Sequence, residues 1–222
     1  MLESFDFTPQ ASKLDSVNKE QHSSSVKYLF IVVTCAYMLP FTCIGSLIIY
    51  FSAKYGQNYF IYLNIAFYMS GLPVALVQRR IDSYMDIFFG SKYTYRRRLW
   101  LCLSVLTLCL ILAPFLDFYT LIIDVAVVGF CTWVCHGSTT SLSGMVQQNS
   151  SIMQQIGFAL PAVYGVIANV VFDLASEDIS QLNLILFYFT SALFCVVGII
   201  AWVSAPLLTS CPFTVQAFSG YN

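Results

Sequence analysis

Residues 182–205 read LNLILFYFTSALFCVVGIIAWVSA, a stretch without a single charged side chain. One helix needs about 20 predominantly apolar residues to cross the hydrocarbon core of a bilayer. A helix that is apolar on all sides has no face to turn toward water. The stretch therefore predicts a transmembrane helix, with lipid as its solvent.

Five further stretches of the chain have the same character. They are Tyr28 to Ser52, Tyr59 to Val77, Leu99 to Leu116, Tyr119 to about Met145, and Ile152 to Phe172. Each is too long and too continuously apolar for a barrel strand, whose hydrophobicity alternates over about ten residues. Composition agrees, because 58% of the 222 residues are hydrophobic and only 9% are charged. We predict an all-α fold, a polytopic membrane bundle of six transmembrane helices, and exclude a soluble domain.

Basic residues are distributed unevenly between the two sets of loops. One set carries Lys54 alone, whereas the other set, together with the segment before Tyr28, contains Lys13, Lys19, Lys27, Arg79, Arg80, Lys92, Arg96, Arg97 and Arg98. Cytoplasmic loops carry the excess of Lys and Arg in membrane proteins. We therefore expect a cytosolic N-terminus in a multi-pass protein of the plasma membrane or an endomembrane.

The chain divides into three parts. Residues 1–27 form a polar tail expected in the cytosol, residues 28–205 form the six-helix domain, and residues 206–222 form a short C-terminal tail. Within the domain, residues 78–98 form a basic cytosolic loop. Its mixture of arginines and apolar residues suits a helix lying on anionic headgroups. A loop that only sets the topology has the same composition, so both interpretations stand.

Polar residues are concentrated in the fourth apolar stretch, where they form two stripes at helical spacing. One face contains Gly129, Thr132, His136, Thr140 and Ser143, and a neighbouring face contains Gly137, Ser141 and Gly144. The first stripe could line a substrate path, because polar groups in a membrane face protein or a water-filled cavity. For His136 the alternative is a bundle histidine with its hydrogen bonds satisfied. The second stripe is expected to let another helix approach closely.

Proline and glycine interrupt several of the predicted spans. The fifth stretch places Gln154, Gly157, Pro161, Gly165 and Asn169 along one side, and the first two contain Pro40 and Pro73. Such residues suit hinges in a bundle that rocks around a cavity, although they are also generally common in membrane helices. The third and sixth stretches are plainer, and we expect them on the outside of the bundle.

Catalytic and metal chemistry are not predicted. Cys131, Cys135 and His136 lie on one apolar helix without a fourth ligand, so no metal site is expected. Asp124 and His136 are the ionisable groups of the spans apart from cysteine and tyrosine, and they fall on different helix faces. We expect no enzyme activity, no cofactor and no nucleic acid partner.

Short motifs in the spans resemble those of a known family. Residues 38–42 read Met-Leu-Pro-Phe-Thr where that family has Leu-Leu-Pro-Trp-Asn, and residues 71–74 read Gly-Leu-Pro-Val around a recurring Leu-Pro pair. Residues 136–138 read His-Gly-Ser in place of Gln-Gly-Ser, a Gly-containing stretch follows at 154–157, and an acidic loop follows at 176–178. In this order of features the chain resembles the N-terminal six-helix half of the equilibrative nucleoside transporters, whose fold is a major-facilitator-like half.

The resemblance implies facilitative transport of nucleosides or nucleobases by alternating access. It implies that Phe41 and Thr42 face the nucleoside, that Val74 forms an apolar wall, and that His136 replaces the glutamine that reads the base. Thr132 and Thr140 join this set from the polar stripe. The Ser-Gly-Gln-Gly run of the family is not intact, because residues 156–159 read Ile-Gly-Phe-Ala.

Length is the larger departure from the family, whose members have eleven helices. The ribose-binding Asp and Arg of their second half have no counterpart here, so we expect a truncated chain, or a half that works with a second helical bundle or with a copy of itself. Two alternatives remain open: a non-transporting membrane interaction or regulatory protein, and half of another major-facilitator-type transporter.

Overall fold

The computed structural model describes residues 28–89, 91–146, 150–176 and 178–205, and these residues form helices and no strands. The polar tails 1–27 and 206–222 lie outside the described residues. In chain order the elements are the first helix (Tyr28–Ser46), α2 (Ile48–Tyr55), α3 (Tyr59–Phe89), α4 (Ser91–Leu112), the short 3-10 helix η1 (Ala113–Phe115), α5 (Phe118–Val146), α6 (Ser150–Val171) and α7 (Gln181–Ser204).

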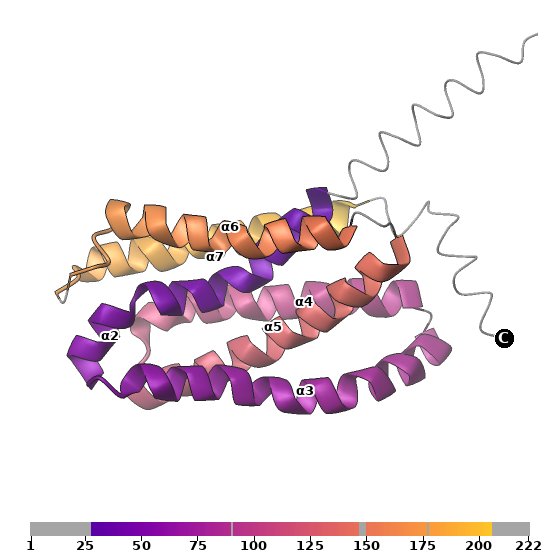
Figure 1. The fold of residues 1–222 in the computed structure, drawn as a ribbon, viewed down its shortest axis with the longest axis horizontal. Coiled ribbons are helices and arrows are strands. Elements are labelled where there is room, and N and C mark those ends of the chain that lie inside the picture. Colours follow the sequence, from indigo (N-terminus) through magenta and orange to yellow (C-terminus); the bar gives the residue numbers. More distant parts are fainter. Residues whose placement is uncertain (1–27, 90, 147–149, 177, 206–222) are drawn as a thin grey trace, which may run out of the picture.

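Six helices of the described region are long and apolar enough to cross a membrane, with spans of 19 to 27 residues. The predicted fold class, an all-α bundle of six membrane helices, is therefore confirmed. The start of the first helix and the end of α7 lie at the same end of the bundle (Figure 1). The arginines of residues 78–98 gather at this end, whereas Lys54 in α2 lies at the other.

The first span is shorter than predicted. Its helix ends at Ser46, and α2 starts at Ile48 after a turn at Leu47. Thr42 and Ser46 donate side-chain hydrogen bonds to carbonyls four residues earlier, to Met38 at 3.3 Å and to Thr42 at 3.1 Å. Such bonds compete with the backbone ladder and bend helices. The apolar sequence continued to Ser52, but the helix changes direction before that residue.

Residues 78–98 differ from the predicted loop. α3 continues through them to Phe89, and α4 begins at Ser91. With 31 residues, α3 is about 46 Å long, which exceeds the roughly 30 Å of the hydrocarbon core. Apart from Gly90, which lies outside the described residues, the segment consists of the extended ends of two membrane helices. It is therefore not a separate helix lying along the surface.

The first helix is the most buried of the six spans (Figure 1). α6 and α7 lie along one side of the bundle, α3 lies along the other, and α5 crosses between them with α4 behind it. Pro40 cannot donate to the carbonyl of Ala36, and the thiol of Cys195 on α7 donates to that carbonyl instead, at 3.1 Å. Gly198 of α7 lies directly against the Ala36 side chain. A proline that weakens the helix therefore coincides with a close contact between two helices.

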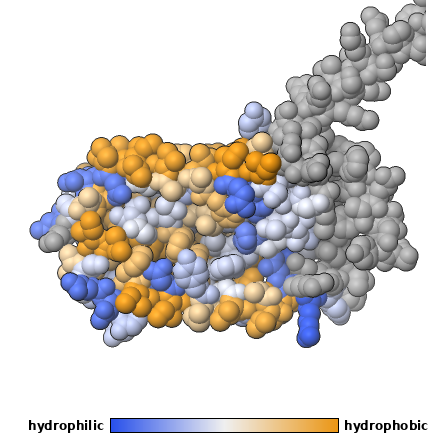
Figure 2. Space-filling view, viewed as in Figure 1, coloured by the Kyte–Doolittle hydropathy of each residue, from blue (hydrophilic) through white to orange (hydrophobic). Residues whose placement is uncertain are grey.

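The expectation that the two plainer spans lie outside is wrong. The spans of α4 and α7 are 44% and 39% buried, whereas those of α3 and α6 are 22% and 28% buried. The exposed residues of α3 and α6 are largely apolar, and Figure 2 shows apolar side chains along both of these edges with paler, more polar residues between them. In water such edges would be unstable, so their natural surroundings are lipid or protein.

Candidate functional site

Tyr37 is the centre of a polar network between the first helix, α5 and α6. Its side chain is fully buried. The Tyr37 hydroxyl lies 3.2 Å from Thr139 Oγ1, 3.4 Å from His136 Nδ1 and 3.5 Å from Gln154 Nε2. A buried hydroxyl needs such partners, because an unpaired polar group inside the bundle would cost several kcal/mol. The network therefore joins three helices at one point.

Gln154 of α6 connects the rest of the network. It is only 3% exposed. Its amide nitrogen donates to Thr140 Oγ1 at 3.0 Å and lies 3.2 Å from Thr139 Oγ1. Its amide oxygen lies 3.3 Å from the Ser143 hydroxyl. The amide therefore bridges one turn of α5, and its carbonyl and NH₂ ends meet groups of matching polarity.

The contacts around Tyr37 are compatible with two tautomers of His136. Thr139 donates its single hydroxyl hydrogen to the backbone, since Oγ1 lies 2.9 Å from the Cys135 carbonyl oxygen. Thr139 Oγ1 can therefore accept a hydrogen from the Tyr37 hydroxyl or from the Gln154 amide. If it accepts from Tyr37, the contact between Tyr37 and His136 places a hydrogen on Nδ1, and if it accepts from Gln154, the Tyr37 hydroxyl can donate to Nδ1. An imidazole with its hydrogen on Nδ1 leaves Nε2 unprotonated, so that Nε2 can only accept a hydrogen bond.

Aromatic rings surround the half-buried imidazole. The Phe158 ring of α6 lies 5.4 Å from it and the Trp133 ring of α5 lies 6.1 Å from it, measured between ring centres. Phe158 also meets the Tyr37 ring edge-on at 6.2 Å. Within the described residues, the hydrogen bonds of His136 involve Nδ1 and the backbone, and Nε2 has no partner. The site thus combines two flat aromatic rings with one imidazole nitrogen that has no partner among the described residues.

The structure brings together three of the six residues predicted to bind substrate. His136 and Thr140 belong to the network described above. The Thr132 hydroxyl donates to the Tyr37 carbonyl oxygen at 3.2 Å, one turn from His136 on α5. These three positions share the face of α5 that meets the first helix and α6.

The other three residues lie outside this network. Phe41 stacks on Phe67 of α3, with 4.0 Å between ring centres. Thr42 bonds to its own helix and faces Gly165. Val74 is buried on α3. No hydrogen bond joins these three residues to His136 in the described part of the chain.

The predicted packing residues of α6 lie against the first helix. Gly157, Pro161 and Gly165 are all buried. A Cβ added at Gly157 would lie 2.6 Å from the Thr34 Cβ, and one at Gly165 would lie 2.9 Å from Ser46 Oγ. Of the predicted hinge prolines, Pro40 is buried and Pro73 is exposed on α3.

The small-residue stripe of α5 separates into two parts. A Cβ at Gly137 would lie 2.6 Å from Gln78 Oε1 of α3, so this position does allow a close approach. Ser141 is exposed and bonds to the Gly137 carbonyl at 2.9 Å, and a Cβ at Gly144 would meet nothing within 4 Å. Close approach of another helix is therefore seen at Gly137 and not at Gly144 within the described residues.

A second polar cluster lies between α3, α4 and α5, nearer the arginine-rich end. Gln78 Nε2 donates to the Val134 carbonyl oxygen at 3.3 Å and lies 3.4 Å from Ser138 Oγ. Arg98 Nη1 also donates to Ser138 Oγ, at 3.4 Å. Ser138 is completely buried. The cluster ties three helices together where the basic side chains begin.

Sequence reasoning missed two members of the network, Tyr37 and Thr139. Nothing in the sequence distinguishes Tyr37 from the other aromatic residues of the apolar spans, and Thr139 lies off the predicted stripe. Gln154 was recognised only as part of a small-residue face. A polar amide in an otherwise apolar span was the available signal for Gln154.

The described residues contain no group of three or more His, Cys, Asp or Glu side chains that could hold a metal ion. Comparisons of the chain with protein-family models, with curated proteins and with solved structures gave no match. A function for this membrane protein is therefore inferred from its own residues.

Proposed function

We propose that this chain is one helical bundle of a facilitative transporter for nucleosides or nucleobases, and that His136 binds the base. One observation carries the proposal: the His136 imidazole, whose Nε2 has no partner among the described residues, lies beside two aromatic rings at the junction of three membrane helices, and we take its hydrogen to be on Nδ1. A planar heterocycle can lie against such rings, and its N–H or amino group can donate to Nε2.

The position of the network also supports a transport role. It lies within the spans, and secondary transporters commonly bind substrate between helices near the bilayer midplane. Alternating access requires one bundle to move against another. We therefore propose that the bundle works together with a second one. The paler band between α3 and α6 in Figure 2 is the face on which such a partner would enclose a cavity.

The polar groups of the network already have partners within the protein, and this supports a second candidate function. Each end of the Gln154 amide already has protein partners. A satisfied network can serve only to hold three helices in register. In that case the protein is a non-transporting membrane interaction or regulatory protein, and His136 is a structural residue.

Thermal stabilisation by ligands distinguishes the two functions, because a ligand that binds only the folded state raises stability. The purified chain is heated with uridine or with 3-methyluridine, which lacks the N3 hydrogen. Transport predicts stabilisation by uridine and a loss of about tenfold in affinity for 3-methyluridine, as expected for one hydrogen bond. His136→Ala should remove the difference between the two ligands.

Asn64→Ala provides the matched control. Asn64 is a half-buried polar residue of α3 that bonds to its own helix, at the Phe60 carbonyl. This variant should keep the preference for uridine. No stabilisation by any nucleoside at millimolar concentration would reject the base site and favour the interaction protein.

A further inference from the structure

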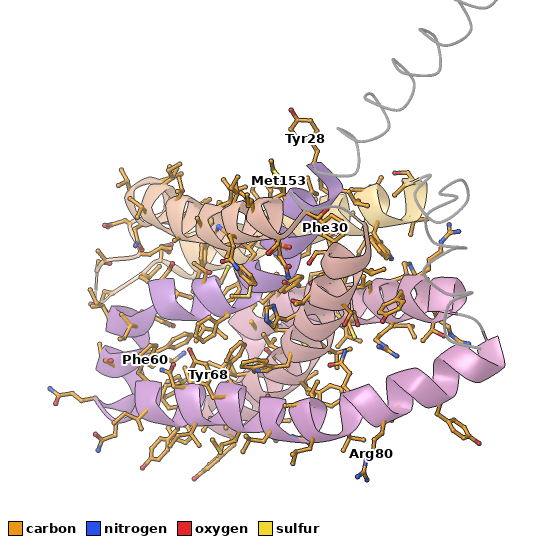
Figure 3. The ribbon with its side chains drawn as sticks, turned by 45° about the vertical axis from the view of Figure 1, so that its right-hand side comes forward. Tyr28, Phe30, Phe60, Tyr68, Arg80 and Met153 are labelled. Carbon is orange, nitrogen blue, oxygen red and sulfur yellow. The ribbon has the colours of Figure 1, made fainter. Side chains whose placement is uncertain are left out.

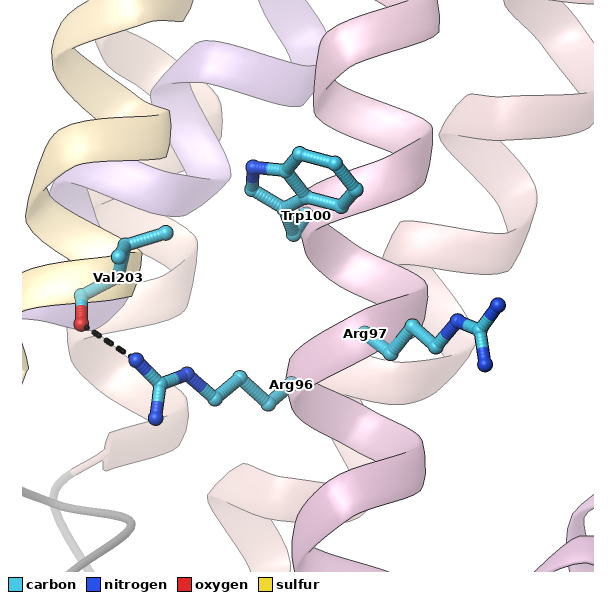
Figure 4. Close-up of a pocket in the computed structure, with 4 residues that line it drawn as sticks. All are labelled: Arg96, Arg97, Trp100 and Val203. Atoms are coloured by element: carbon cyan, nitrogen blue, oxygen red, sulfur yellow. Dashed lines mark hydrogen bonds between the residues drawn. The ribbon is translucent and has the colours of Figure 1, made fainter.

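A pocket of about 370 Å³ opens on the surface between α4 and α7, at the arginine-rich end of the bundle. Arg96, Arg97, Trp100 and Val203 line it (Figure 4). Among the described residues, two positively charged side chains, an indole and a valine line this site. This combination matches the headgroup region of a bilayer, where charge and hydrocarbon meet.

Hydrogen bonds join the two helices that line the pocket. Arg96 Nη2 donates to the Val203 carbonyl oxygen at 3.1 Å, and Trp202 Nε1 of α7 donates to the Arg96 carbonyl oxygen at 3.2 Å. The Val203 carbonyl belongs to the last turn of α7, which lacks helical partners of its own. Arg96 therefore caps α7 and ties it to α4, so this wall of the pocket exists before any ligand arrives.

The Arg97 side chain extends from α4 in the opposite direction to that of Arg96, away from Val203 (Figure 4). It is exposed, and it has no hydrogen bond or ion pair within the described residues. A guanidinium has five N–H donors in a planar fork that fits a phosphate. Arg97 can thus supply the charge and the hydrogen bonds that an anion needs, while Arg96 holds the wall.

Trp100 places the site at the depth of a lipid headgroup. It lies four residues after Arg96, so its ring is about 6 Å deeper along α4. The ring is 44% exposed, and Val203 and Ile200 of α7 are exposed beside this seam. Tryptophan prefers the level of the headgroups, where its apolar ring faces the chains and its N–H faces water.

We propose that this pocket binds an anionic phospholipid, with its phosphate at Arg97 and its glycerol and first methylenes against Trp100 and Val203. The charge of the site is opposite to that of the lipid. The apolar side chains of Trp100 and Val203 favour a lipid over a free phosphate, which has no apolar part to contact them. The site lies at the end of the bundle predicted to face the cytosol, where anionic lipids concentrate.

Quenching of tryptophan fluorescence by brominated lipids tests the proposal. The full chain is reconstituted in vesicles of phosphatidylcholine with increasing brominated phosphatidic acid, or with brominated phosphatidylcholine as the neutral comparison. We expect phosphatidic acid to quench at lower fractions than phosphatidylcholine. Arg97→Gln should weaken the apparent affinity for phosphatidic acid about fivefold, since one basic residue at the surface contributes about 1 kcal/mol.

Arg80→Gln is the matched control. Arg80 is an exposed arginine at the same end of the bundle, but it points outward from α3 (Figure 3) and does not line the pocket. It should change the quenching little. Arg97→Lys, which keeps the charge but loses the planar fork, should fall between wild type and Arg97→Gln. Equal weakening by Arg80→Gln and Arg97→Gln would overturn the site, because it would indicate a diffuse charge effect.

Two further outcomes would overturn the proposal. Equal quenching by the neutral and the anionic lipid would show that the pocket has no preference for the anionic headgroup. Full competition by soluble glycerol phosphate at the lipid concentration would show a site for a free phosphate group. Neither measurement involves a nucleoside, so this proposal and the proposed transport function succeed or fail independently.

Discussion

Gly157 of α6 lies directly on Thr34 of the first helix: a Cβ at position 157 would come 2.6 Å from the Thr34 Cβ and 2.8 Å from the Ile31 carbonyl oxygen. The close approach explains how Gln154, one turn earlier on α6, reaches Tyr37. In lipid, helices associate through such small residues and through hydrogen bonds between them, because there is no hydrophobic driving force. The packing and the polar network are therefore one structural unit.

We expect Gly157→Ala to destabilise the bundle by about 1–3 kcal/mol, because overpacking against a rigid backbone forces the two helices apart. The midpoint of thermal unfolding in detergent measures the effect. Gly144→Ala is the control: a Cβ there meets nothing within 4 Å. That variant should be neutral or slightly stabilising, since alanine is the better helix former. Equal destabilisation by both would contradict the contact.

Gln154→Leu should lower the free energy of unfolding by about 1–3 kcal/mol. The substitution keeps the approximate size of the side chain but removes the amide that contacts the Thr139, Thr140 and Ser143 hydroxyls. Gln155→Leu is a close control, because Gln155 is the exposed neighbour on the same helix. Chemical denaturation of both variants gives the comparison, and an effect of Gln155→Leu as large as that of Gln154→Leu would reject the role of Gln154.

Nitrogen NMR should find His136 protonated at Nδ1. The chain contains two histidines, so selective ¹⁵N labelling in a His22→Ala background leaves one imidazole. Tyr37→Phe should shift the imidazole toward a mixture of tautomers, because the acceptor for the Nδ1 hydrogen is lost. A spectrum with the hydrogen on Nε2 would show that Nε2 is a donor, and the preference for bases with an N–H group would then fail.

Tyr188→Phe should stabilise the protein. The Tyr188 hydroxyl has no hydrogen-bond partner in the described region although the residue is only 1% exposed. Removal of an unpaired buried hydroxyl can be worth about 1 kcal/mol. Tyr164→Phe, which deletes a hydroxyl 2.9 Å from Ser191 Oγ, should instead lower stability. A loss of thermal stability in Tyr188→Phe would indicate that its hydroxyl has a partner in solution.

Cysteine labelling tests the orientation predicted from the basic residues. Gln57 lies between α2 and α3, and Arg80 lies at the opposite end of the bundle. In intact cells or right-side-out organelles, a membrane-impermeant maleimide should modify Gln57→Cys, and it should modify Arg80→Cys only after permeabilisation. The reverse pattern would place the arginine-rich end outside and would remove the reason to expect cytosolic lipids at Arg97.

The position of the spans could be predicted because it depends on local sequence. A helix in lipid satisfies its backbone hydrogen bonds internally, so about 20 apolar residues are sufficient to define it. Three of the predicted spans agree closely with α5, α6 and α7, whereas α4 begins well before the predicted start at Leu99. The helix face of Gly157, Pro161 and Gly165 also followed from spacing alone, since their buried positions repeat with the helical period.

Partner choice between helices had no comparable local signal. Tyr37 meets His136 across 99 residues, and the amide of Gln154 lies 117 residues from Tyr37. Any of several polar side chains could have met Tyr37, and only the geometry of three crossing helices selects among them. The same is true of Arg96 and Val203, whose hydrogen bond joins α4 and α7 beside a surface pocket.

The sequence by itself thus determined an all-helical membrane protein, the approximate ends of its six spans and the segregation of its basic residues. Tertiary structure alone decided that the first helix is central, that α3 continues as one helix to Phe89, and that Tyr37, His136 and Gln154 meet. The physical reason is that insertion into lipid depends on each segment separately, whereas close packing and shared hydrogen bonds depend on which faces the helices turn toward one another.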